Sequence, residues 1–351
     1  MKKTIALVLL LVLAMGVLVA CNQVVPTEKK IRWENSESWT YDISLANFST
    51  STTTTNGTYY QDFLYSGETN PYTGSADRVV PNALSGKYVV TVSKDATNTT
   101  VETTQTMLAT YDTTSPETWL EGSFKDLVDS HTETSVTLKS ETITKVVFSS
   151  TPSQTPVSSY TKVNGFYIGN QYQSVTKYEI STEYTVKGNK TIAKVTNDGK
   201  TTEQEISGTN VIDNNQVLMY VRSFDKTSSG FQDNPQVMVF DPLTGSTRRM
   251  TFVYNASQNF LLNHKFADAT ESSQVATTVN RLDVLMDGLP FMTQVNLPNL
   301  ADEKLDQINT SVVSSTVAKH TICRFRVGFV SYQLTEYLTD EMVKAIQAKV
   351  E

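Results

Sequence analysis

Short stretches in which apolar and polar residues alternate recur along the chain from residue 38 onward. In the first stretch, Trp39, Tyr41 and Ile43 occupy every second position, which is the pattern of a strand with one buried face. Comparable candidates follow near residues 88–92, 101–111, 136–148, 178–206, 237–254, 279–297 and 318–334. This spacing predicts a mainly β protein with many antiparallel strands, arranged as one large twisted sheet or as two sheets.

Turn sequences join several of these strands. Asp198-Gly199 separates two strand-like runs, and this dipeptide is a strong hairpin signal because both central residues of a type I′ turn need a positive φ angle. Residues 241–245 and the pair Asp287-Gly288 predict two further turns. The second half of the chain is therefore expected to be a series of hairpins.

One helix is predicted before the C-terminus. Asp213 has the position of an N-cap, because the apolar residues behind it recur at helical spacing. These residues are Val217, Tyr220, Val221 and Phe224. A second short helix is predicted over residues 339–346. With few helices against many strands, we expect the helices to pack on or across one face of the sheet.

The N-terminus carries the pattern of a lipoprotein export signal. Lys2 and Lys3 precede an apolar run over residues 5–13, and the run ends in Leu-Val-Ala-Cys at residues 18–21. In such signals the Cys21 sulfur takes a diacylglycerol, residues 1–20 are removed, and acyl chains such as palmitate anchor the protein to the membrane. The alternative is an uncleaved transmembrane helix over residues 4–20, which would need about 20 apolar residues. The two lysines and the short apolar core favour the signal peptide.

The signal divides the chain into a signal peptide (1–20), a lipidated tether (21–37) and a β-rich domain (38–351). Pro152 and Pro156 lie among Ser and Thr residues and mark a candidate internal boundary near residues 150–160. The anchor predicts the extracytoplasmic face of the cell membrane. Ser, Thr, Asn and Tyr are abundant and Arg and Gly are scarce, a composition that indicates an AT-rich genome. This favours a Gram-positive surface over a Gram-negative periplasm.

Charge and cysteine content exclude several classes of partner. The chain has 29 basic and 36 acidic residues, and removal of Lys2 and Lys3 with the signal leaves 27 against 36, a net charge of −9. This balance argues against a nucleic-acid partner and against a basic membrane-binding patch. If Cys21 carries lipid, Cys323 has no partner for an internal disulfide, so the core must stabilise the fold. Cys323 alternates with apolar residues and is expected to be buried.

No catalytic or metal-binding motif stands out. His131, His264 and His320 lie far apart, so we predict no zinc site and no cofactor. Neither a nucleophile elbow, nor a zinc-protease helix, nor a phosphate-binding loop is present. We predict that the protein is not an enzyme. A carboxylate pair for glycoside hydrolysis stays open, because the fold sets the spacing of such a pair.

Several stretches of the C-terminal half resemble a family of uncharacterised bacterial envelope proteins, a domain of unknown function. They are VIDNNQVLMYVR (211–222), VFDPLTG (239–245), LDVLMDGLP (282–290), CRFR (323–326) and YQLTEY (332–337). That family is similar to the lipoprotein carriers and mycobacterial lipid-binding lipoproteins of the LolA/LppX type, in which an antiparallel sheet wraps round an apolar cavity and helices plug its mouth. The resemblance implies a large curved, half-barrel-like sheet and brings no catalytic residues.

A curled sheet would turn two strand rows and one helix face toward a common cavity. The candidate ligand-binding residues are Leu218, Tyr220, Phe224, Met250, Phe252, Tyr254, Leu282, Val284 and Met286. Adaptable Met and aromatic side chains suit an irregular apolar ligand. The alternative interpretation is that these residues form the core between sheet and helix.

Two functional hypotheses follow. The first is a lipid-anchored lipoprotein that binds a lipid or another hydrophobic molecule in the curved sheet. The second is a cell-surface interaction module that binds glycan or protein through exposed Tyr, Trp and Asn side chains. An open apolar groove would favour the first hypothesis, and a filled core with a flat aromatic patch would favour the second.

Overall fold

The structure is a computed structural model of the chain, and it describes residues 36–45, 83–112, 134–151, 153–168, 178–222, 236–264, 268–271, 273–287, 289–296, 322–327 and 330–336. The predicted signal peptide, Cys21, most of the tether, Phe224, His131, His320 and the helix predicted over 339–346 lie outside the described residues. The backbones of Tyr254 and His264 are described, whereas their side chains are not.

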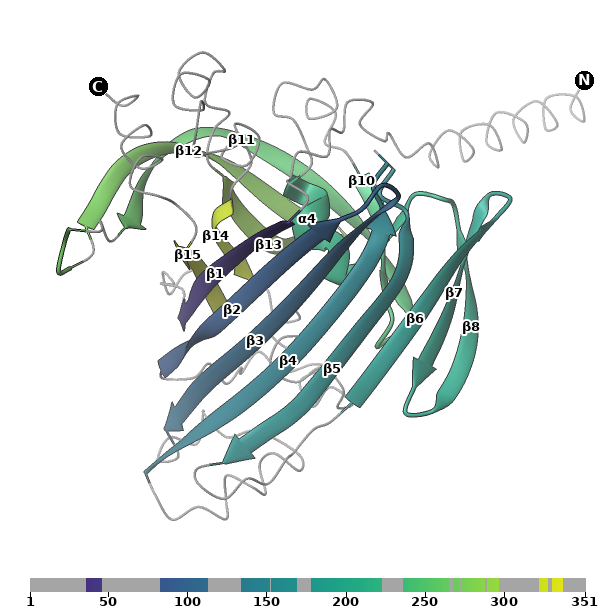
Figure 1. The fold of residues 1–351 in the computed structure, drawn as a ribbon, viewed down its shortest axis with the longest axis horizontal. Coiled ribbons are helices and arrows are strands. Elements are labelled where there is room, and N and C mark those ends of the chain that lie inside the picture. The colour runs from purple at the N-terminus through teal and green to yellow at the C-terminus, as the bar shows by residue number, and fades with distance from the viewer. Residues whose placement is uncertain are drawn as a thin grey trace, which may run out of the picture.

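The protein is mainly β, and the described strands form one 15-stranded sheet, as the alternating pattern predicts (Figure 1). The strands of the first half are β1 (Ser36–Leu45), β2 (Ala83–Lys94), β3 (Asn98–Asp112), β4 (Ser135–Ser149), β5 (Pro156–Ile168), β6 (Tyr178–Lys187), β7 (Lys190–Asn197) and β8 (Lys200–Ser207). Those of the second half are β9 (Val211–Asp213), β10 (Gln236–Asp241), β11 (Ser246–His264), β12 (Ser273–Met286), β13 (Leu289–Asn296), β14 (Ile322–Val327) and β15 (Val330–Glu336).

The first strand lies in the middle of the sheet. β1 pairs with β2 on one side and with β15 on the other, and the strand order is β8-β7-β6-β5-β4-β3-β2-β1-β15-β14-β13-β12-β11-β10-β9. The chain therefore winds outward to β8, crosses to β9 at the opposite end, and winds back to β15. Neighbouring strands are antiparallel except for β9 and β10, which are parallel. β4 and β5 pair across the candidate boundary near residues 150–160.

The short connection between the two outermost strands forces the sheet to curl. Residues 208–210 alone join β8 to β9. A chain extends by at most about 3.5 Å per residue, so this connection spans roughly 14 Å. In a flat sheet, with strands about 4.8 Å apart, the outermost strands would be roughly 67 Å apart. The two ends of the sheet must therefore meet, although β8 and β9 do not pair within the described residues and the half-barrel stays open.

The two ends of the sheet pack against each other through side chains, in a contact that we call the seam. Its core consists of Ile180, Tyr184, Ala193, Val195, Ile206, Val211 and Phe240, from β6–β8 on one side and β9–β10 on the other. The rings of Tyr184 and Phe240 meet edge to face with centroids 6.1 Å apart. Side-chain packing thus replaces the backbone pairing that a closed barrel would have.

A short helix lies inside the curl. The 3-10 turn η3 (Asn214–Gln216) leads into α4 (Val217–Arg222) (Figure 1). Val217, Met219 and Tyr220 pack in the same core cluster as buried residues of β1–β4, β9–β12, β14 and β15. The predicted N-cap is confirmed, because the Asp213 side chain accepts a hydrogen bond from the Asn215 backbone N–H at 2.8 Å. A six-residue helix is not stable alone, so packing against the sheet maintains it.

The three predicted hairpins are confirmed, because β7 pairs with β8, β10 with β11 and β12 with β13 in antiparallel register. Several strands are longer than the sequence pattern predicts. Asp198 and Gly199 have φ angles of 47° and 77°, as a type I′ turn requires. β3 and β4 each run for 15 residues, whereas the candidate stretches predicted from the alternation cover residues 101–111 and 136–148. β5 runs through a Ser/Thr-rich stretch that the pattern does not mark as a strand. Cys323 is buried as expected. No helix in the described part of the chain is long and apolar enough to cross a membrane.

Candidate ligand-binding cavity

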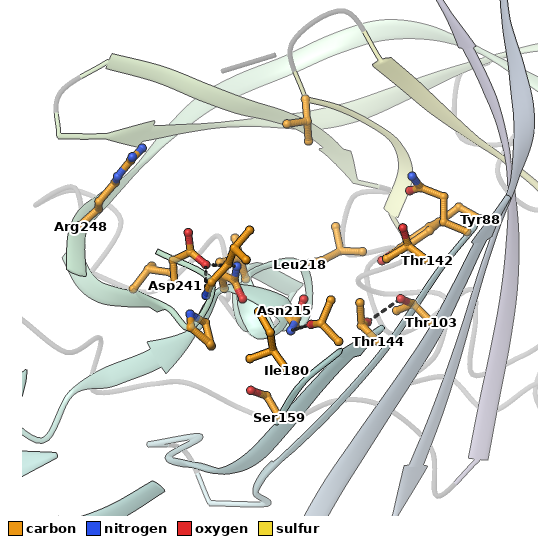
Figure 2. Close-up of a pocket in the computed structure, with 18 of the residues that line it drawn as sticks. Tyr88, Thr103, Thr142, Thr144, Ser159, Ile180, Asn215, Leu218, Asp241 and Arg248 are labelled. Carbon is orange, nitrogen blue, oxygen red and sulfur yellow. Dashed lines mark hydrogen bonds between the residues drawn. The ribbon is translucent and has the colours of Figure 1, made fainter. Parts of the chain in front are cut away.

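A cavity of about 250 Å³ lies inside the curl, between the middle of the first-half strands and the α4 region (Figure 2). Its floor comes from β3–β6, and the opposite side comes from η3, α4, β10–β12 and β14. The cavity adjoins the core cluster, because Val217 of α4 and Val239 of β10 belong to both.

One wall of the cavity is polar. It is formed by Thr103, Gln105, Thr142, Thr144, Ser159 and Thr161, at inward-facing positions of the adjacent strands β3, β4 and β5. The hydroxyls of Thr103 and Thr144 are 2.6 Å apart and share a hydrogen bond. The Asn215 amide donates to the Thr161 hydroxyl at 2.9 Å, which joins this wall to η3.

The facing wall is mostly apolar. It is formed by Val217, Leu218, Val239, Leu243, Met286, Phe325 and Val327, whereas Ile180 of β6 adds an apolar side chain beside the polar wall. Phe325 belongs to an aromatic cluster. Its ring stacks on that of Tyr332 with the ring centroids 4.2 Å apart, and it meets the Tyr41 ring edge to face with the centroids 5.3 Å apart. Tyr88 packs on the same cluster and lines the cavity. Burial raises the pKa of the Tyr88 hydroxyl to about 12, so this side chain is neutral at physiological pH.

Among the described residues, the charged side chains that line the cavity are Asp241 and Arg248. The Asp241 carboxylate caps the turn that follows β10, accepting hydrogen bonds from the Leu243 backbone N–H, the Thr244 hydroxyl and the Asn214 amide. The half-buried Arg248 guanidinium donates to the Met286 sulfur at 3.4 Å.

A buried polar cluster supports the cavity at the seam. The fully buried Asp213 carboxylate accepts a 2.5 Å hydrogen bond from the Tyr184 hydroxyl and is hydrogen-bonded to Ser159, a residue of the polar wall. Burial raises the pKa of Asp213, although its hydrogen bonds oppose this shift. Burial, and then the Asp213 charge, raise the pKa of Tyr184 well above its ordinary value. The cluster fixes the start of η3, and so the position of α4 against the polar wall.

The nine ligand-binding residues predicted from the sequence fall into three groups. Leu218 and Met286 line the cavity. Tyr220, Met250, Phe252, Leu282 and Val284 are buried in the core between sheet and helix, as in the alternative interpretation. Phe224 and the Tyr254 side chain lie outside the described residues.

The sequence analysis missed the polar wall and Arg248. The signal for the wall was present, because Thr and Gln interrupt the apolar alternation at inward positions of β3. Arg248 extends the row of Met250 and Phe252 by one more inward position, where an apolar residue would continue the pattern. No group of three or more potential metal ligands occurs among the described residues.

Comparisons with protein-family models, with curated proteins and with solved structures find no match to this chain.

Proposed function

We propose that the protein is a bacterial lipoprotein, anchored through acyl chains on Cys21, that binds a lipid or another hydrophobic molecule inside its curved sheet. The observation that carries the proposal is the cavity next to α4, with an apolar wall that includes Leu218, Met286 and Phe325. Clefts lined by apolar side chains with a few convergent polar groups are the usual form of small-molecule sites. The resemblance of the C-terminal half to LolA/LppX-type half-barrels supports the same class of ligand.

The anchor sets where this binding takes place. The proposed signal peptide and Cys21 place the protein on the extracytoplasmic face of the membrane. A tether before β1 would keep the half-barrel near the lipid surface, within reach of membrane-derived molecules. The proposed partners are therefore the membrane and a hydrophobic small molecule.

Binding rather than catalysis is favoured by the state of the carboxylates near the cavity. Asp241 accepts hydrogen bonds from two donors of its own turn and from Asn214 of η3, and Asp213 is hydrogen-bonded to Tyr184, Ser159 and the start of η3. Both carboxylates thus have structural hydrogen-bond partners. A general acid or base needs to reach a substrate proton directly.

The alternative, a surface interaction module, would use exposed aromatic side chains. The exposed large hydrophobic residues in the described part of the chain are Leu108, Ile143, Val157 and Val186, which are all aliphatic and lie on four different strands. This surface gives the alternative less support than the cavity gives to ligand binding.

Native mass spectrometry tests the proposal. The soluble form that starts after Cys21 is purified from a lipid-containing host and measured before and after organic extraction. We expect additional mass from bound lipid, which extraction removes. A bare mass, with no uptake of added fatty acid or phospholipid, would contradict the proposed function and favour the interaction module.

A further inference from the structure

We infer that the cavity selects an amphiphile with one acyl chain and a negatively charged head, and that Arg248 binds this head. The inference rests on the proposed function and specifies its ligand. It begins from a cation that faces the cavity and has no charged partner among the residues that the structure describes.

The Arg248 guanidinium has few protein partners. It carries five N–H donors, and the one acceptor that the described residues provide is the Met286 thioether at 3.4 Å, which is a weak acceptor. The described ion pairs all join lysines to acidic residues on β1–β8, and none includes Arg248. A half-buried arginine in this state has donors available for a carboxylate or a phosphate, which it binds with two parallel hydrogen bonds.

Asp241, the other charged residue of the cavity, does not neutralise Arg248. Its oxygens accept from the Leu243 N–H at 3.0 Å, the Thr244 hydroxyl at 2.8 Å and the Asn214 amide at 3.2 Å. The Asp241 carboxylate thus has three hydrogen-bond donors in the protein, two from the turn after β10 and one from η3. Charge complementarity therefore favours an anion beside Arg248.

The shape of the cavity defines the rest of the ligand. In Figure 2, Arg248 and Tyr88 lie on opposite sides of the cavity, and Leu218 lies between them. A chain that starts at Arg248 can thus run past Met286 and Leu218 toward the aromatic cluster. The cavity volume of about 250 Å³ lies just below the range of about 300–1,000 Å³ found for drug-sized ligands, which favours one chain over two.

The test compares charged and neutral amphiphiles with the same chain. The protein contains residues 21–351 with Cys21→Ser, which retains every residue that the structure describes. Dodecanoate and dodecyl phosphate are titrated by calorimetry below their micellar concentrations, and 1-dodecanol is titrated below its solubility limit. Arg248→Gln is compared with Arg249→Gln, because Arg249 is the next residue of β11 and is exposed. Arg248→Lys tests whether positive charge alone restores binding.

We expect Arg248→Gln to weaken binding of at least one anion about tenfold or more, as the loss of a charge-assisted hydrogen bond predicts. Binding of 1-dodecanol should change less than about twofold, Arg249→Gln should change neither, and Arg248→Lys should restore part of the loss. Equal effects on the anions and the alcohol, or an equal loss with Arg249→Gln, would overturn the inference while leaving the proposed function intact. No binding of any probe to the unmodified protein would contradict the proposed function itself.

Discussion

Buried polar residues contribute to the contact between the two ends of the open sheet, and Asp213 is the clearest example. Its carboxylate is fully buried, caps η3 and binds the Tyr184 hydroxyl across the seam. A buried carboxylate costs free energy unless its hydrogen bonds are satisfied. Asp213 therefore favours the arrangement of the two sheet ends that keeps its hydrogen bonds. The sequence identified Asp213 as an N-cap but gave no indication of Tyr184, which precedes it by 29 residues.

Asp213 should make stability depend on pH. Burial raises its pKa above the ordinary value of 3.8, and the facing groups are Tyr184, Ser159 and Asp241. The folded state therefore holds the proton more tightly, so this contribution to the unfolding free energy is fully present below pH 3.8 and is lost as the pH rises through the folded-state pKa. Asp213→Asn should lack this loss. Urea unfolding at a series of pH values measures the difference between the two proteins.

The matched control for that experiment is Asp198→Asn, in the exposed turn after β7. Asp198→Asn keeps Asp213, so its unfolding free energy should vary with pH in the same way as that of the unmodified protein. Parallel stability curves for the unmodified protein and Asp213→Asn would contradict the assigned role of the buried carboxyl.

The Tyr332 hydroxyl provides a second test at this scale. It donates to the Gln105 side-chain oxygen at 3.1 Å, and both side chains are buried. Tyr332→Phe removes this donor, and we expect a loss of about 1–3 kcal/mol in unfolding free energy. Tyr160→Phe removes a hydroxyl that is hydrogen-bonded to Glu179 at a half-exposed site, where water can replace the bond, so stability should change by less than about 0.5 kcal/mol. Equal effects of the two substitutions in urea unfolding would argue against a structural role for the buried hydrogen bond.

At the scale of elements, the turn residues predict the hairpins. The full lengths of strands with polar inward-facing residues are harder to predict. The Asp198-Gly199 turn was predictable because its backbone angles depend on those two residues. The full lengths of β3 and β4 were not, because Thr103 and Thr144 face inward where the alternation rule expects apolar residues. The same residues form the polar wall, so the rule fails where the candidate site lies.

Gly86 controls how closely β2 and β3 approach. A Cβ atom at this position would lie 2.1 Å from the Thr106 carbonyl oxygen, which is backbone and cannot rotate away. We expect Gly86→Ala to lower the unfolding free energy by about 3 kcal/mol, at the upper end of overpacking effects. Gly188→Ala is the control, because its φ is +62° but nothing lies within 4 Å, so it carries only the backbone strain of about 1–2 kcal/mol. Chemical denaturation that ranks Gly188→Ala as the more harmful change would contradict this account.

At the scale of the whole molecule, two arms diverge from β1 and meet again at the seam. The sequence predicts a curved sheet through its resemblance to half-barrels, but not the strand order. Pairing of β1 with β15 joins residues almost 300 positions apart, and no local pattern encodes such a contact. The short connection from β8 to β9 becomes informative only when both strands are known to be outermost.

Phe240 tests whether the seam maintains the curl. Phe240→Ala and Phe148→Ala both remove a fully buried ring, and each should cost about 3–5 kcal/mol of unfolding free energy. Only Phe240 lies in the seam, whereas Phe148 belongs to the main core cluster. Hydrogen exchange should therefore show faster exchange in β6–β8 for Phe240→Ala than for Phe148→Ala. The same pattern in both variants would indicate that the seam does not hold the arms together.

The central claim is that a ligand binds inside the curl, and photo-crosslinking tests it most directly. A fatty acid with a diazirine in its chain is photolysed with residues 21–351 carrying Cys21→Ser, and the labelled peptides are identified by mass spectrometry. We predict label on α4 and β12, near Leu218 and Met286. Excess dodecanoate should suppress this label, and so should Leu218→Trp, which fills the cavity. Leu108→Trp, at an exposed site, should leave the label unchanged. Label on exposed strand positions, or label that Leu218→Trp does not reduce, would contradict the account.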